Sequence, residues 1–197
     1  MFRKKRSNLT FYQKKKTISP KVIREIFSWI GVTIVAIIVA FAFVLCFGMQ
    51  VKVIGDSMEP TAYNGQTVLI NKVIFKIFGP SKDDVVVFLP NGNANSHFYV
   101  KRVVAVPGDK VQIIDGKLYI NGEVAAEDEA KYDKMEDAGI AANEIKLGSG
   151  EYFVLGDNRN YSFDSREEAV GNINRKDIIG RTWLRVYPFS DFGIIDK

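Results

Sequence analysis

The feature that most limits what this chain can fold into is a run of 26 residues without a charged side chain, Ile26 to Val51, bounded by Glu25 and Lys52. About 20 apolar residues in a helix cross the hydrocarbon core of a bilayer, so the run predicts a transmembrane helix with room for tilt. A cleavable signal peptide has an apolar core of only about 7–15 residues. We therefore expect an uncleaved anchor over residues 26–51, with Trp29 near one membrane interface.

The basic residues are concentrated before this run. Of the 27 Lys and Arg, nine lie in residues 1–25 together with a single acid, so the remaining 172 residues carry 18 bases and 22 acids. The overall charge of +4 thus belongs to the tail and does not indicate nucleic-acid binding by the rest of the chain. A basic arm that binds nucleic acid is the alternative interpretation. Its position beside the apolar run instead predicts, by the positive-inside rule, a cytoplasmic tail (1–25) and an extracytoplasmic domain (52–197).

Cysteine and histidine are nearly absent. Cys46 is the only cysteine and lies inside the apolar run, and His97 is the only histidine. No disulfide can form within one chain, and a Cys/His metal site or a Cys–His catalytic pair is excluded. We expect no metal and no cofactor, a packing or lipid-facing role for Cys46, and a surface position for His97.

Beyond the apolar run the pattern is one of short strands and turns. Asp115-Gly116 between two apolar runs predicts a type I′ hairpin, and Asn121-Gly122 predicts a second turn. Few stretches favour a helix, so we predict a mainly β, barrel-like domain of short antiparallel strands after one N-terminal transmembrane helix. The acidic, Ala-rich stretch 123–150 is expected to be a solvated insertion. The expected strands are 51–54, 66–72, 84–89, 97–100, 111–114, 117–120, 152–155 and 183–187.

One connector, Val73 to Gly79, is unusually apolar for its place between two strands. It can be a core element, or it can be a patch that rests on lipid through Phe75, Ile77 and Phe78. The sequence leaves both interpretations open.

Three stretches carry the candidate chemistry. Gly55 to Thr61, with the sequence GDSMEPT, predicts a tight turn that exposes the hydroxyl of Ser57. Taken alone it can equally be an ordinary surface turn. It is followed by Tyr99 to Asp109 (YVKRVVAVPGD) and by Gly156 to Arg166 (GDNRNYSFDSR).

In this order the three stretches resemble the motifs of the bacterial type I signal peptidases, which are membrane-anchored serine proteases with a Ser-Lys dyad. The resemblance extends from about Ile26 to Pro188. It implies a signal peptidase of the cell membrane that cleaves N-terminal signal peptides from secreted preproteins at the outer face. The implied partners are signal peptides and the lipid bilayer, with secretion machinery nearby and no nucleic acid.

A serine hydroxyl needs a base to remove its proton, and without a catalytic histidine an amine can serve. Lys101 stands among apolar residues, and burial would lower its pKa from the reference of about 10.4. Strand alternation would direct Lys101 and Arg102 to opposite faces, so that one is buried and the other solvated. The alternative for Lys101 is an ordinary surface lysine.

The resemblance also assigns roles to single residues. Ser57 matches the nucleophile, Lys101 the general base, and Ser162 the hydroxyl that holds the lysine in place. Three further positions match supporting residues, for which we favour a structural role: Asp157, Asp164 and Arg166. The backbone N–H of Ser57 is the expected oxyanion donor, whereas the second donor stays open because Gly55 stands where some members have serine.

Substrates of that family have small residues one and three positions before the cut. An extended peptide can bind by adding to exposed strand edges. The candidate edges are 50–54 and 97–100, which give these substrate-binding residues: Gln50, Val51, Val53, Ile54, Phe98, Tyr99 and Val100.

Two other functions compete with this interpretation. A self-cleaving repressor with a Ser-Lys dyad shares the chemistry, but the apolar run and the lack of a helical DNA-binding domain count against it. A membrane-tethered β module that binds leaders without cutting them is the non-enzymatic alternative. The presence of both Ser57 and Lys101 counts against that reading.

Overall fold

The computed structural model describes residues 19–47, 49–93 and 97–195, which cover nearly all of the predicted elements. Contacts divide the chain after Phe41 into two compact units. The first is built on helix α1 (Pro20–Phe47), whose described side chains are all exposed, and residues 20–44 are long and apolar enough to cross a membrane. The predicted helix is thus present, and Cys46 is part of it, although its side chain lies outside the described residues.

The bounds of α1 differ from the uncharged run. The helix begins at Pro20, because proline is tolerated at the first helical position, where its missing N–H costs no hydrogen bond. It ends at Phe47, and Met49 to Lys52 instead form a strand. The run without charged residues therefore predicted the helix, but it did not predict the residue at which the strand begins.

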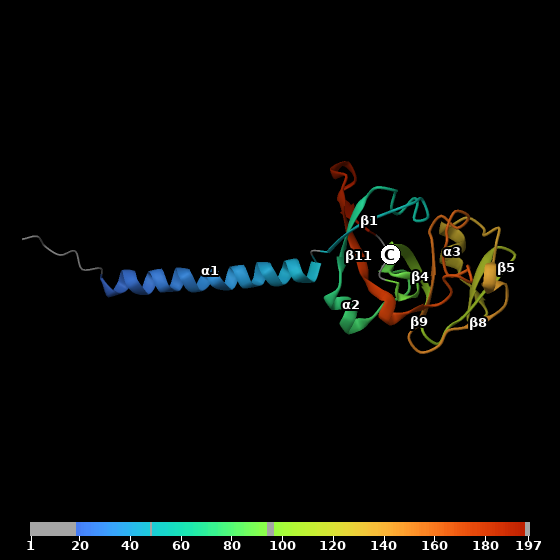
Figure 1. Cartoon of the computed structure of the whole chain (residues 1–197), viewed down its shortest axis with the longest axis horizontal. Coiled ribbons are helices and arrows are strands. Elements are labelled where there is room, and N and C mark those ends of the chain that lie inside the picture. Colours follow the sequence, from blue (N-terminus) through green and yellow to red (C-terminus); the bar gives the residue numbers. More distant parts are fainter. Residues whose placement is uncertain (1–18, 48, 94–96, 196–197) are drawn as a thin grey trace, which may run out of the picture. The chain divides into compact units, whose positions relative to one another are not determined.

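The second unit is mainly β, as predicted, and Figure 1 shows its strands as one connected body. The larger sheet is an antiparallel half-barrel with the strand order β1-β2-β11-β3-β4-β9-β10, and β12 pairs with β11. Its strands are β1 (Met49–Lys52), β2 (Thr67–Asn71), β3 (Val85–Phe88), β4 (Tyr99–Ala105), β9 (Glu151–Leu155), β10 (Ile173–Asn174), β11 (Ile178–Tyr187) and β12 (Gly193–Ile194).

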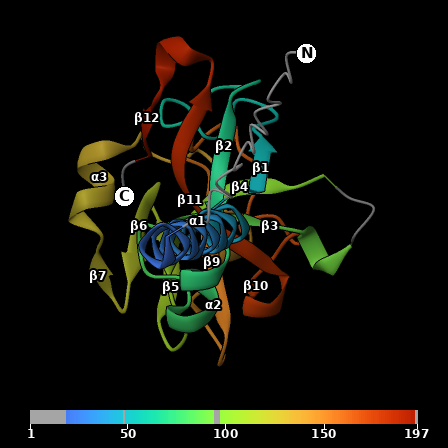
Figure 2. The same ribbon diagram turned by 90° about the vertical axis from the view of Figure 1, so that its left-hand side faces the viewer.

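A smaller sheet of four strands has the order β7-β6-β5-β8. Helix α3 (Ala126–Lys131) follows β7, and Figure 2 shows it at the left beside that strand. Asp115 and Gly116 both have positive φ, 50° and 75°, which confirms the predicted turn between β5 and β6. The strands are β5 (Lys110–Ile114), β6 (Lys117–Ile120), β7 (Glu123–Val124) and β8 (Ile145–Lys146).

The prediction of a solvated insertion over residues 123–150 was wrong in part. Met135, Ala141 and Leu147 are buried there and close the apolar core of the smaller sheet. Acidic residues dominate the composition of the segment, whereas a few well-spaced apolar residues fix its position. The segment therefore belongs to the folded domain.

Short helical turns connect the strands. Between β2 and β3 lies α2 (Val73–Phe78), in which Phe75 is buried while Ile77 and Phe78 are exposed. Of the two interpretations left open for this connector, the core one holds for Phe75, whereas Ile77 and Phe78 lie at the surface. The remaining turns are η1 (Pro90–Gly92), η2 (Gly139–Ala142), η3 (Arg175–Asp177) and η4 (Phe189–Asp191).

One apolar cluster supports the segment that carries Ser57. It includes Met58 from that segment, Val68 from β2 and Val100 from β4, all buried. Near the C-terminus Ile195 joins the same cluster. The loop after β1 is thus attached to the sheet by buried side chains rather than lying free on its surface.

Candidate active site

The structure brings Ser57 and Lys101 together from distant parts of the chain. Ser57 lies in the loop between β1 and β2, and Lys101 lies in β4, where it pairs with Val86 of β3. The Nζ atom of Lys101 and the Oγ atom of Ser57 are 2.6 Å apart, which is hydrogen-bond distance. Lys101 is 5% exposed, so this pair is shielded from bulk water.

The loop that carries Ser57 is held by its own backbone and by a second segment. The amide of Ala62 donates to the carbonyl of Met58 at 2.8 Å, and the amide of Asn158 donates to the carbonyl of Ser57 at 3.1 Å. Gly55 has a φ of 81°, a left-handed conformation that glycine adopts without strain. The backbone of Ser57 is thus held by its own loop and by the segment that contains Asn158.

Burial sets the protonation of Lys101. Desolvation lowers its pKa from 10.5 to about 8, and this effect outweighs the carboxylates of Asp164 and Asp157, which favour the charged amine. Arg166 adds a smaller lowering effect. A substantial fraction of the amine is therefore neutral slightly above neutral pH, which is the form that can accept a proton.

The expectation that one of Lys101 and Arg102 is solvated was wrong, because both side chains are buried. The Nε and Nη2 atoms of Arg102 donate to the two carboxylate oxygens of Asp157 at 2.8 and 2.7 Å. The hydroxyl of Thr61 donates to the same carboxylate at 2.5 Å. Asp157 therefore joins β4 to the loop of Ser57, and the paired charge explains why both faces of β4 are buried here.

Asp164 and Arg166, two of the predicted supporting residues, form an ion pair. The Nε and Nη2 atoms of Arg166 donate to the two carboxylate oxygens of Asp164 at 2.9 and 3.0 Å. Asp164 also accepts from the amide of Gly156 at 3.0 Å, and Arg166 donates to the carbonyl of Arg159 at 2.6 Å. This network fixes the turn that contains Ser162.

Ser162 lies close to Ser57, but its side chain makes no hydrogen bond with Ser57 or Lys101 among the described residues. Its Oγ atom is buried and has no hydrogen-bond partner among the residues that the structure describes. It faces Gly156, where an added Cβ would overlap both the Ser162 hydroxyl and the carbonyl oxygen of Ser57. Gly156 thus allows the segments of Ser57 and Ser162 to approach each other. No local sequence pattern indicates this role of Gly156.

A cleft of about 370 Å³ opens at the Ser57–Lys101 pair. Five of the seven predicted substrate-binding residues line it: Val53, Ile54, Phe98, Tyr99 and Val100. Gln50 and Val51 do not, because they pair with β2, and the side chain of Val51 is in the core. Residues that the prediction missed also line the cleft: Met58, His97, Tyr161 and Phe163.

The strand edges around this cleft are open on one side. Tyr99 and Val100 pair with β3, but pairing of β4 with β9 begins only at Arg102. In the part of the chain that the structure describes, β1 is the terminal strand of the sheet and is bonded to β2. Among the described residues the edge of β4 at Tyr99 and Val100 is therefore open to an extended peptide, whereas Val53 already bonds to Gln66 and Gly65 through its N–H and C=O.

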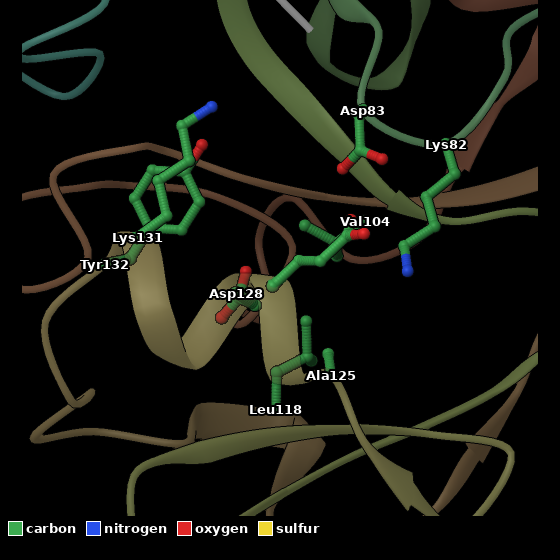
Figure 3. A pocket seen from close by; sticks show the side chains of 9 residues that line it. Lys82, Asp83, Val104, Leu118, Ala125, Asp128, Lys131 and Tyr132 are labelled. Carbon is green, nitrogen blue, oxygen red and sulfur yellow. The ribbon is translucent and has the colours of Figure 1, made fainter.

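A second cavity of about 240 Å³ lies between the Lys82–Asp83 turn and α3, and Figure 3 shows Asp128, Lys131 and Tyr132 around it. Neither Ser57 nor Lys101 lines it. Asp128 forms an ion pair with the buried Arg159 at 2.7 Å, whose guanidinium lies 4.0 Å from the ring of Tyr132. This contact attaches α3 to the segment that carries Asp157 and Ser162, and no local sequence pattern predicts it.

No three His, Cys, Asp or Glu side chains form a metal-binding group in residues 19–47, 49–93 and 97–195. The chemistry that the site can perform with the groups described above is nucleophilic attack by a serine hydroxyl assisted by an amine.

Comparison with known proteins agrees with the geometry. The family model described as signal peptidase, peptidase S26, matches residues 26–187. Signal peptidase IB of Staphylococcus aureus (strain COL) is 37% identical over 187 residues, covering 86% of this chain and 93% of its own length. Signal peptidase I of Bacillus licheniformis is 30% identical over 178 residues, covering 87% and 94%. A crystal structure of a signal peptidase I from Enterococcus faecalis has 28% identity and a TM-score of 0.38, covering 52% of this chain and 95% of that one.

Proposed function

Because this chain belongs to the signal peptidase family, peptidase S26, and is therefore a serine peptidase that cleaves signal peptides from preproteins, we propose that it does so with Ser57 as nucleophile and Lys101 as general base. The observation that carries this assignment is the 2.6 Å separation of Ser57 Oγ and Lys101 Nζ in a buried site. The lowered pKa of Lys101 supports it, since only the neutral amine can accept the hydroxyl proton.

In the proposed reaction the neutral amine of Lys101 takes the proton of Ser57 as Oγ attacks the scissile carbonyl carbon. The resulting ammonium then gives this proton to the leaving amine, which departs as the new N-terminus of the mature protein. The leader stays as an ester on Ser57 until water, deprotonated by Lys101, attacks the ester carbonyl. The Lys101 ammonium then returns this proton to Ser57 Oγ as the ester bond breaks, and the leader leaves as a carboxylic acid that ionises in water. The backbone N–H of Ser57 is our candidate for one oxyanion donor.

The roles of the surrounding ion pairs are indirect in this proposal. Asp157 fixes Arg102 and Thr61, and Asp164 with Arg166 fixes the turn of Ser162. We propose that Ser162 contacts the Lys101 amine during the reaction, since its buried hydroxyl has no partner among the described residues. None of the ion-paired groups is proposed to contact substrate.

We propose that the leader binds in extended form along the free edge of β4 at Tyr99 and Val100 and along the segment Val53–Ile54. Both lie in the cleft of Ser57. The apolar lining and the closeness of buried Met58 suit small apolar side chains beside the cut bond. Gln50 and Val51 do not belong to this proposal, because the cleft excludes them.

We also propose that α1 crosses the cell membrane with residues 1–25 in the cytoplasm and the β domain outside. The nine bases in residues 1–25 and the scarcity of bases just after residue 51 support this orientation. The signal peptides of exported preproteins then reach the site on the outer face, next to the secretion machinery.

One experiment tests the reaction and the orientation together. A preprotein is added to intact spheroplasts that produce either the wild-type chain or the Ser57→Ala variant, and mass spectrometry determines the products. We expect the wild type to generate two complementary fragments, cut after a small residue, at a rate above the Ser57→Ala background from the host's own enzymes. The intact membrane keeps the added preprotein outside.

The outcomes separate the two proposals. Cleavage above background only after detergent lysis would reverse the orientation and leave the reaction in place. No difference between wild type and Ser57→Ala in either condition would contradict the assignment of Ser57.

A further inference from the structure

Helix α2 exposes apolar side chains that the protein itself does not cover. Phe75 packs into the core with Val86 and Phe88, whereas Val73, Ile77 and Phe78 are 41%, 68% and 80% exposed. Val73 and Ile77 are four residues apart and so share one face of the helix. A short helix with one buried residue and three exposed apolar ones presents an outward apolar surface.

Basic residues accompany this surface. Lys72 immediately precedes α2 and Lys76 lies within it, and neither has an acidic partner among the ion pairs of the described residues. Apolar side chains beside lysines are typical of helices that lie in the interface of a bilayer with anionic lipids.

Strand register places α2 near the end of the membrane-spanning segment. α1 ends at Phe47, β1 begins at Met49, and Met49 pairs with Ile70 of β2, three residues before α2 begins. Neighbouring strands are about 5 Å apart, and three residues extend at most about 10 Å, so the start of α2 lies within about 25 Å of Phe47. Figure 1 shows α2 beside β11 on the β1 side of the domain, with β5 and β8 on the opposite side.

We propose that α2 is a second membrane contact of this chain. Val73, Ile77 and Phe78 enter the interfacial layer of the leaflet on the domain's side, and Lys72 and Lys76 face anionic headgroups. This inference rests on the membrane-spanning role of α1 in the proposed function. The contact restricts how far the domain can move from the bilayer on its tether, and it therefore holds the cleft close to the surface where leaders emerge.

The test uses the full-length chain in vesicles of phosphatidylcholine and phosphatidylglycerol, with Cys46→Ser to remove its only cysteine. A polarity-sensitive fluorophore is attached in one variant at Ile77→Cys and in a matched control at Ile114→Cys. Ile114 is an exposed apolar residue, 40% accessible, in β5 on the far side. We expect the emission at position 77, but not at 114, to shift to the blue and to be quenched by spin-labelled lipids.

Equal emission at both positions, without quenching by lipid, would overturn the proposal. A blue shift that appears only when preprotein is added would show that the leader binds this surface. A blue shift that grows with protein density at fixed lipid would show that a second copy of the chain binds it. Either result also overturns the proposal. Cleavage of a preprotein by the same labelled chains is measured in parallel. Its loss in both variants would point to the proposed function instead of to α2.

Discussion

Replacing Ser57 by Ala, or Lys101 by Met, should reduce kcat/KM for preprotein cleavage on the order of 10⁴-fold, because each removes one member of a two-group mechanism. Methionine has a length similar to that of lysine and fills the buried site without a titratable group. Since the two side chains act on the same proton, the double variant should be no slower than the slower single variant.

The control for this prediction is His97→Ala. His97 lines the cleft but does not contact the Ser57–Lys101 pair among the hydrogen bonds of the described residues, so its loss should change the rate by no more than a few-fold. Thermal unfolding of all variants checks that the fold is intact. Cleavage by folded Ser57→Ala at a rate near that of the wild type, or loss of cleavage in His97→Ala, would remove the dyad assignment.

Gly156→Ala should lower kcat/KM by about 100-fold, because a Cβ at this position would overlap the Ser162 hydroxyl and the carbonyl oxygen of Ser57. To make room, the loop of Ser57 must move away from the segment that carries Ser162. A displacement of about 1 Å is enough to cost this factor when a nucleophile and its base must be aligned.

Gly193→Ala is the matched control for Gly156→Ala. An added Cβ at Gly193 would meet its nearest neighbour, the carbonyl of Asp191, at 3.9 Å, which is an ordinary contact. Its kcat/KM should equal that of the wild type. Full activity in Gly156→Ala would show that the close approach at this glycine is not needed for the alignment of the pair.

Local patterns in the sequence predicted eight of the strands at least in part but not β7, β8, β10 and β12, and the Ser57–Lys101 pair came from the resemblance of its motifs. The hairpin at Asp115-Gly116 follows from residues that tolerate positive φ, and the helix follows from the uncharged run. The pair was matched through motifs around each residue, and the fold then brings the two side chains into contact across 44 positions.

What the sequence did not predict depends on contacts between distant segments. Alternation alone indicated that one of Lys101 and Arg102 is solvated, but Asp157, 55 residues from Arg102, stabilises Arg102 in the interior. The sequence left a core and a surface position open for Phe75, which packs against residues of β3, β4 and β9. The close packing of Ser57 and Ser162 against Gly156 exists only in the folded chain, so no local pattern predicts it.

The pH dependence of kcat/KM for preprotein cleavage by the wild-type chain tests most directly the claim that neutral Lys101 is the base. Burial lowers the pKa of Lys101 to about 8, so the protonated, inactive form dominates below that pH and the neutral form above it. We expect kcat/KM to rise with pH, to reach half its maximum near pH 8, and to be about 100-fold below the maximum two pH units lower. A rate that already reaches its plateau between pH 6 and 7, as a histidine base would give, would contradict the account.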